Sequence, residues 1–166
     1  MEIVRAVHAD VSLIMRTERL EGREAMVGRW AETQHRAAMD DPACAYFVGR
    51  DDGRPVGFVI LRGWASPERV TLLKRIAVGA PGRGHGRTLL AGVVDKVFGE
   101  TDAFRLWLGV FPDNLRARRA YEAVGFASEG VARGAAFFEG IHRDELIMSM
   151  LRPDWESARG LAQGAI

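Results

Sequence analysis

The chain has 166 residues, of which 48% are hydrophobic and 27% are charged. These proportions are ordinary for a single globular domain. A formal net charge of +1 gives no reason to expect a nucleic-acid partner, and no apolar run reaches the ~20 residues that span a membrane. The single cysteine, Cys44, excludes an internal disulfide and fits a reducing compartment, so we expect a cytoplasmic protein.

Hydrophobic periodicity and turn signals predict how strands and helices follow one another along the chain. Helical periodicity runs from about 10 to 38 and is interrupted around Gly22. Asp51-Asp52-Gly53 is a hairpin signal, and Glu139-Gly140 is expected to turn a second hairpin. In chain order we expect strands near 2–7, 44–50, 54–63, 69–78, 104–110, 126–138 and 141–151, and later helices at 84–98 and 114–124. A single domain over 1–152 is then followed by a tail, 153–166.

A Gly-rich, basic loop connects the strand near 69–78 to the next helix. Residues 81–88 read Pro-Gly-Arg-Gly-His-Gly-Arg-Thr. Glycines let the backbone come close to a ligand, while the N–H groups and the dipole of a helix N-terminus favour an anion. The loop therefore predicts a site for a phosphorylated cofactor.

Two common nucleotide motifs do not fit this loop. A P-loop needs a glycine at position 81 and a lysine at position 87, but the chain has Pro81 and Arg87. The dinucleotide fingerprint G-x-G-x-x-G fails because Gly82, Gly84 and Gly86 are followed by arginine at position 87. A protein that binds ATP or NAD through this loop is therefore disfavoured.

A second motif follows one helix and one strand later. In this stretch Asp113 or Asn114 can cap a helix and Gly125 can end it. The motif reads N-x-x-A-x-x-x-Y-E-x-x-G-F, formed by Asn114, Ala117, Tyr121, Glu122, Gly125 and Phe126. Together with the loop Arg83-Gly84-His85-Gly86, it resembles the GNAT superfamily of acetyl-CoA-dependent N-acetyltransferases, and the resemblance covers most of the chain. It implies an α/β (α+β) fold of order βααβββαβαββ, with a mixed twisted central sheet and helices on both faces.

The resemblance implies transfer of an acetyl group from acetyl-CoA to a primary amine, by direct attack in a ternary complex and without a metal. The strand ending in Ile76-Ala77-Val78 would splay from its neighbour and bind the pantetheine arm, with the N–H around Ile76 or Ala77 polarising the acetyl carbonyl. Backbone N–H groups from Arg83 to Thr88 would take the pyrophosphate, and Asn114 would bind the cofactor arm. The expected cofactor-binding residues are Ile76, Ala77, Val78, Arg83, Gly84, His85, Gly86, Arg87, Thr88, Asn114, Ala117 and Tyr121.

Tyr121 is the predicted general acid for the departing thiolate. A phenol has a pKa of about 10 and a thiol one of about 8.5, so the phenol stays protonated at neutral pH. Tyr121 lies on the same helix face as Asn114 and Ala117. The alternative is that Tyr121 is only a core residue whose hydroxyl is satisfied.

A general base is harder to assign. Histone-type members of the superfamily have a glutamate where this chain has Leu72, and the ribosomal-protein alanine acetyltransferases have one where it has Gly109. At pH 7 an α-amine is about 10% neutral and a lysine amine about one part in 2,500, so a low-pKa amine is favoured. Replacement bases could come from the N-terminal helices: Glu18, Glu21, Glu24 and His35.

The acceptor is expected to contact the N-terminal helices and the hairpin over 126–145. Glu21, Trp30 and His35 are the candidate substrate residues, although each is also explained as an ordinary helix or core residue. Trp64, Phe137 and Phe138 could line the same cleft.

Arg133 and Asp144 resemble a pattern in the branch that includes ribosomal-protein serine and alanine acetyltransferases, and we expect them to form a structural salt bridge in the hairpin. The expected acceptor is a small-molecule amine or a peptide N-terminus. Two alternative functions stay open: a non-catalytic acyl-CoA-binding module and a transferase with a different acyl donor. The oligomeric state is also open, with a homodimer through the C-terminal hairpin edge as one arrangement.

Overall fold

The computed structural model describes residues 1–21 and 28–160, and its elements follow the predicted order. Every predicted strand is present. In the described part of the predicted helical segment, 10–38, a 3-10 turn leads into one helix and a second helix follows, while the predicted interruption at Gly22 lies outside the described residues. The elements are β1 (Glu2–Arg5), η1 (His8–Asp10), α1 (Val11–Glu18), α2 (Glu32–Asp40), β2 (Cys44–Asp51), β3 (Arg54–Arg62), β4 (Val70–Val78), α3 (His85–Glu100), β5 (Arg105–Val110), α4 (Leu115–Val124), β6 (Ala127–Phe138), β7 (Ile141–Leu151) and α5 (Arg152–Ala158).

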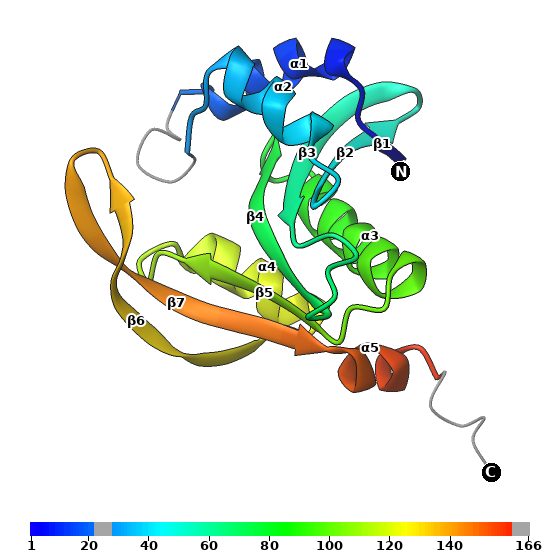
Figure 1. The fold of residues 1–166 in the computed structure, drawn as a ribbon, viewed down its shortest axis with the longest axis vertical. Coiled ribbons are helices and arrows are strands. Elements are labelled where there is room, and N and C mark those ends of the chain that lie inside the picture. The colour runs from blue at the N-terminus through cyan, green and yellow to red at the C-terminus, as the bar shows by residue number, and fades with distance from the viewer. Residues whose placement is uncertain (22–27, 161–166) are drawn as a thin grey trace.

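The strands form one seven-stranded sheet in the order β1-β2-β3-β4-β5-β7-β6. All neighbours are antiparallel except β4 and β5, which run parallel because helix α3 crosses between them. Helices α1 and α2 lie on one side of the sheet and α3 and α4 on the other (Figure 1). The predicted mixed sheet with helices on both faces is confirmed.

Side chains of the central strands alternate between two apolar cores. On β2, Ala45 and Phe47 join the core under α3, whereas Tyr46 and Val48 join the smaller core under α1 and α2. A strand that is covered on both faces reads as a continuous apolar run, as residues 44–48 do.

A β-bulge in β4 reverses this alternation. Ile60 of β3 pairs with Arg75 and Leu61 pairs with Leu73, so Lys74 is an extra residue without a partner. Leu73 belongs to the α3 core, but after the bulge it is Ile76 that packs there. Arg75 is thereby turned toward α1, where it meets Glu18.

Strands β4 and β5 separate soon after they meet. They pair only from Val70 to Leu72, opposite Arg105 to Trp107. Beyond that point β4 rises toward α1 and α2 while β5 runs toward the hairpin tip on the left of Figure 1. The predicted splay is therefore present, and it leaves a gap between the two strands.

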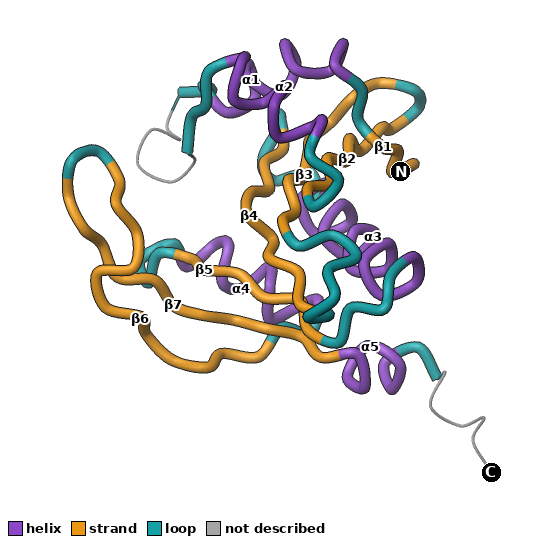
Figure 2. The backbone as a smooth tube through the Cα atoms, viewed as in Figure 1, coloured by secondary structure: helices purple, strands orange, loops and turns teal. Residues whose placement is uncertain are grey.

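Strands β6 and β7 form a long, curved hairpin (Figure 2). Glu139 and Gly140 have φ values of 50° and 81°, as a two-residue type I′ turn requires. Strand β6 ends the sheet, and dimerisation through this edge stays a prediction.

At the C-terminus, part of the expected tail is helical. In α5 the indole N–H of Trp155 donates to Asp95 at 2.8 Å, and its ring packs on Phe98. Pro153 in the first turn and Asp154, which accepts the N–H of Leu151, explain this start. Residues 161–166 lie outside the described residues. No helix within 1–21 and 28–160 is long and apolar enough to cross a membrane.

Candidate functional site

The Gly-rich loop presents backbone N–H groups at the start of α3. Gly82 and Gly84 have φ values of 88° and 78°, and a Cβ at either would meet nothing within 4 Å. The backbone conformation, and not crowding, therefore requires glycine at these positions. Gly84 is the N-cap and offers no side chain, so the first-turn N–H groups of this 16-residue helix have no cap from it.

The basic side chains of the loop have different surroundings. Arg83 is exposed. Arg87 instead reaches α4 and donates to the carbonyl of Ala123 at 3.3 Å. Nε2 of His85 lies 3.6 Å from Asp51, while Nδ1 is buried with no hydrogen-bond partner among the described residues. An anion at this loop would thus meet chiefly backbone N–H groups and Arg83.

The register of β4 decides which of its N–H groups face the gap. Gly79 N–H donates to the carbonyl of Val56 at 2.8 Å, so the polar backbone groups of residue 79 point toward β3. Because these directions alternate along an antiparallel pair, those of Ala77 also face β3. The N–H of Ile76 therefore points into the gap. Of the two N–H groups considered for polarising the acetyl carbonyl, those of Ile76 and Ala77, only the one of Ile76 faces the gap.

Helix α4 carries the second motif along the gap. The Asn114 side-chain oxygen accepts the N–H of Ala117 at 3.2 Å and caps the helix, which leaves the amide NH₂ for a ligand. Gly125 ends the helix at φ 111°. Tyr121 is 8% exposed and its ring packs on Phe126. Burial raises the pKa of Tyr121 to about 12, so its phenol stays protonated over the physiological range.

Two of the predicted bases lie in a buried polar cluster. Glu18 is fully buried and binds the guanidinium of Arg75. Its other oxygen lies 3.2 Å from Nε2 of His35, and Nδ1 of that ring lies 3.2 Å from the hydroxyl of Tyr46. A carboxylate can only accept, so in the neutral ring Nε2 donates to Glu18 and Nδ1 accepts from Tyr46. These contacts favour a structural role for Glu18 and His35.

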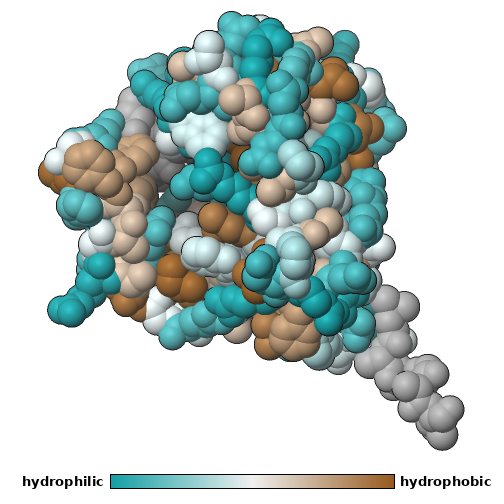
Figure 3. Space-filling view, viewed as in Figure 1, coloured by the Kyte–Doolittle hydropathy of each residue, from teal (hydrophilic) through white to brown (hydrophobic). Residues whose placement is uncertain are grey.

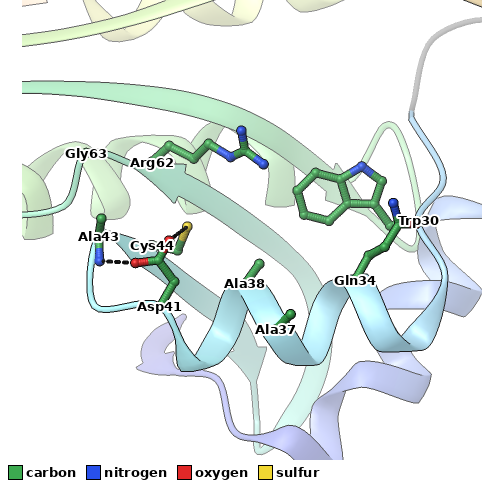
Figure 4. Close-up of a pocket in the computed structure, with 9 residues that line it drawn as sticks. All are labelled: Trp30, Gln34, Ala37, Ala38, Asp41, Ala43, Cys44, Arg62 and Gly63. Carbon is green, nitrogen blue, oxygen red and sulfur yellow. Dashed lines mark hydrogen bonds between the residues drawn. The ribbon is translucent and has the colours of Figure 1, made fainter.

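Trp30 packs beside this cluster. The guanidinium carbon of Arg75 is 4.9 Å from the ring centroid, and that of Arg62 is 5.3 Å away. The ring borders a hollow of about 540 Å³ between α2 and the ends of β2 and β3 (Figure 4). The lining residues are Trp30, Gln34, Ala37, Ala38, Asp41, Ala43, Cys44, Arg62 and Gly63. Glu21 is exposed, and Glu24 lies outside the described residues.

The other predicted aromatic residues do not gather at one cleft. Trp64 packs on Phe47 at 5.5 Å between centroids, in the core. Phe138 packs on Phe111, while Phe137 is 68% exposed near the hairpin tip.

One carboxylate beside the gap was missed by sequence reasoning. An ideal Cβ on Gly109 would lie 2.7–2.9 Å from the carboxylate atoms of Glu145, so this side chain fills the space over the glycine. The sequence does contain a signal for this carboxylate. Leu146, Met148 and Met150 alternate along β7 and are buried on one face of the sheet, so Glu145 projects from the other face. Pairing β7 with β5 was needed to read it.

Among the residues that the structure describes, no three His, Cys, Asp or Glu side chains are grouped to hold a metal ion. On the gap side of the sheet the molecule is hollowed between the hairpin and its main body, with hydrophobic side chains visible at the lower edge of the hollow (Figure 3).

Solved structures share this fold. A spermidine N-acetyltransferase SpeG variant from Vibrio cholerae superposes with a TM-score of 0.81 at 24% identity, over 96% of this chain and 99% of that one. Another Vibrio cholerae spermidine N-acetyltransferase structure, in complex with CoA and spermine, gives 0.80 at 22% identity over 93% and 96%. These identities establish similarity of fold.

Curated relatives match part of the chain. Probable N-acetyltransferase YjcK of Bacillus subtilis is 39% identical over 64 residues, which are 39% of this chain and 35% of the relative. Uncharacterized N-acetyltransferase Mb2688 of Mycobacterium bovis is 36% identical over 96 residues, 55% of this chain and 58% of the relative. The chain thus spans about a third to three-fifths of these relatives.

The family profile covers both motifs and the gap between them. The profile described as acetyltransferase (GNAT) family matches residues 13–126, from α1 through the splayed strands to the end of the second motif. Loop, splay and capped α4 therefore occur together on one matching scaffold, and the chain belongs to the GNAT acetyltransferase family.

Proposed function

We propose that the chain transfers an acetyl group from acetyl-CoA to a primary amine, by direct attack in a ternary complex. The observation that carries this proposal is the gap between β4 and β5, with the Gly-rich start of α3 at one end. Ile76 and Val78 of β4 pack on the same apolar core as Tyr121, so α4 lies beside the gap.

The residues present fit acetyl-CoA. The N–H groups at the start of α3 and the guanidinium of Arg83 suit a pyrophosphate, whose charge the helix dipole also favours. The N–H of Ile76 and the amide of Asn114 provide donors along the gap for an extended amide-containing arm. Acetyl-CoA supplies the activated acetyl thioester when it is bound.

Each chemical role falls to a described group. The N–H of Ile76 would donate to the acetyl carbonyl oxygen and stabilise the negative charge that develops there. Tyr121, held as a neutral phenol, would donate a hydrogen bond to the departing sulfur. The buried ring fixes the direction of that hydroxyl, because it packs on Phe126.

We propose a small-molecule amine as the acceptor. Fold neighbours are named as spermidine acetyltransferases, and one was solved with spermine, which supports this class. A peptide N-terminus, as in the ribosomal-protein branch, is the second candidate. It rests on Arg133 and Asp144, but Asp144 accepts the backbone N–H of Gly134 at 2.8 Å and so serves the hairpin.

A thermal-shift titration tests the cofactor. Acetyl-CoA at a hundred times its Kd should add about 2.7 kcal/mol to the free energy of unfolding. ATP and NAD serve as controls and should give no shift. A shift with ATP or NAD but not with acetyl-CoA would contradict the proposed cofactor.

Turnover with a panel of amines tests the reaction and the acceptor. Free thiol release is measured with polyamines and with peptides that carry a free N-terminus. Binding of acetyl-CoA without turnover on any amine would identify a non-catalytic acyl-CoA-binding module. Faster turnover with a longer acyl-CoA would instead identify another donor. Because Cys44 is the single cysteine and is buried, we place this activity in a reducing compartment, the cytoplasm.

A further inference from the structure

We propose that Glu145 is the general base of the acetyl transfer, and this assignment rests on the proposed function. Its place in the sheet is the first argument. Leu146, Met148 and Met150 of β7 are buried in the core under α3 and α4. Glu145 therefore projects from the opposite face, as Gly109 does on the neighbouring strand β5.

The close approach to Gly109 is the second argument. The carboxylate atoms of Glu145 lie 2.7, 2.8 and 2.9 Å from where a Cβ at position 109 would stand. The backbone of Gly109 is not in the left-handed region, so this close approach alone explains the glycine. Gly109 leaves room for a carboxylate that comes from β7.

Access from the acceptor side is the third argument. The apolar residues under α1 and α2 come from β1 to β4, and β5 and β7 continue beyond these helices (Figure 1). Glu145 is partly exposed there. Glu18, in contrast, is fully buried and bound to Arg75. Of these two carboxylates, Glu145 is the one that a substrate amine can reach.

Lys74 is a charged side chain that interacts electrostatically with Glu145. Lys74, the extra residue of the β4 bulge, is exposed overall, yet nearby atoms displace enough water to lower its pKa. Arg62 and Arg75 lower this pKa further, and Glu145 opposes them. Gly109 of β5 and Ala132 of β6, which also neighbour Glu145, are uncharged. Arg143, two residues before Glu145 on the same face of β7, forms an ion pair with Asp113.

The proton transfers balance as follows. The Glu145 carboxylate takes one proton from the substrate ammonium and later releases it to water. The free amine nitrogen attacks the acetyl carbon, so a C–N bond forms and the C–S bond breaks. The second proton leaves the nitrogen and ends on the CoA sulfur, beside the hydroxyl of Tyr121. The products are the amide, free CoA and one proton in solution.

Glu145→Gln tests the assignment, because glutamine keeps the shape and removes the basicity. We expect kcat at pH 7 to fall about 100-fold while the Kd of acetyl-CoA is unchanged. The rate of the variant should recover as the pH rises through the pKa of the free substrate amine. The matched control is Asp144→Asn, whose amide oxygen still accepts the N–H of Gly134 and whose kcat should stay within twofold of wild type.

A double variant tests whether a carboxylate supplied by strand β5 can replace that of Glu145. Starting from Glu145→Ala, the added change Gly109→Asp places a carboxylate in the space that Glu145 had filled. We expect at least a tenfold gain in kcat over Glu145→Ala alone. Melting curves of all the variants check that they fold.

The two proposals fail in different ways. Wild-type protein that acetylates no amine overturns the proposed function, and the assignment of Glu145 falls with it. Active wild-type protein whose Glu145→Gln variant has an unchanged kcat and pH profile overturns the assignment alone. A lower kcat that stays equally low at every pH also overturns it, since a base is then not what was lost.

Discussion

The two sides of the gap between β4 and β5 differ in the kind of group that they offer: backbone N–H groups on one side and side chains on the other. On the proposed cofactor side, the groups that would face acetyl-CoA are backbone N–H donors of the loop, of the start of α3 and of Ile76. On the proposed acceptor side they are side chains: Glu145 of β7 would contact the amine, with Lys74 of the β4 bulge near it and Trp30 packed on Arg75. One side depends on conformation, whereas the other depends on which side chains tertiary structure brings together.

This difference explains how each side tolerates substitution. Backbone donors survive any side-chain change that keeps the φ and ψ angles, so only glycines with a left-handed conformation are critical there. Side chains on the acceptor side need partners from distant elements to stay in place. Substitutions on each side of the gap test this difference in tolerance.

Removing the anchor of the acceptor side should have the largest effect. Glu18→Gln leaves the guanidinium of Arg75 buried without its carboxylate, which should cost about 3 kcal/mol of unfolding free energy. Urea unfolding measures the loss. Glu32→Gln is the control, because Glu32 forms an exposed pair with Arg36 that should contribute only about 0.3 kcal/mol. Equal losses for both variants would show that the buried pair does not anchor this side.

Tyr121 should account for a loss of similar size in the reaction alone. Tyr121→Phe removes the hydroxyl and should lower kcat about 100-fold, which corresponds to about 2.7 kcal/mol. Steady-state kinetics with saturating acetyl-CoA measure it. In the matched variant Tyr46→Phe, the hydroxyl lost is one that contacts His35, so stability should fall while kcat stays near wild type. An unchanged kcat for Tyr121→Phe would leave Tyr121 with a packing role only.

The cofactor side is tested by its backbone. Gly84→Val forces a β-branched residue to a φ of 78°, which costs about 1–2 kcal/mol and should weaken acetyl-CoA binding about tenfold. Calorimetric titration gives the Kd. Gly99→Ala, near the other end of α3, serves as control, since its Cβ would meet nothing within 4 Å and the backbone is not left-handed. If both variants bind equally well, the loop conformation does not determine the affinity.

The smallest effect should come from the far end of the open sheet face. Hydrogen bonds from Arg105 and then Ser149 lower the pKa of Glu129 to about 2. Because the folded pKa lies below the unfolded value of 4.5, this carboxylate stabilises the protein above pH 4.5 and the effect is lost as the pH falls toward 2. With 40% of the side chain exposed, solvent screening leaves about 0.5 kcal/mol.

Glu129→Gln should therefore lower stability at pH 7 and match wild type near pH 2, as followed by denaturant unfolding across that range. A difference that persists at low pH would mean that packing, and not charge, holds Glu129.

The fold, the Gly-rich loop and the cap of α4 were predictable because their signals are contiguous in the sequence. Alternating apolar residues marked the strands, and Asp52-Gly53 and Glu139-Gly140 marked turns that adopt positive φ. The loop and the capped helix at Asn114 each occupy a single stretch. Pro153 and Asp154 are a signal for the start of α5, but the small and polar residues of this segment favoured a tail.

The acceptor side was not predictable in the same way, because its partners are distant in sequence. Glu18 and His35 are separated by seventeen positions, and Arg75 by 57, yet they form one buried cluster. The bulge at Lys74 inserts one residue into an apolar run and reverses which face Arg75 occupies. The proximity of Glu145 to Gly109 becomes apparent only when β7 is paired with β5.

The short pairing between β4 and β5 also has a consequence for how the chain folds. The hairpins β2–β3 and β6–β7 close through local turns, which form within microseconds. The two halves of the sheet are joined between β4 and β5 at only three positions, Val70 to Leu72, and those contacts span more than thirty residues. Because such non-local pairs form slowly, we expect this junction to be completed last. A ligand seated across the gap would then act as a late clamp and slow unfolding more than it speeds folding.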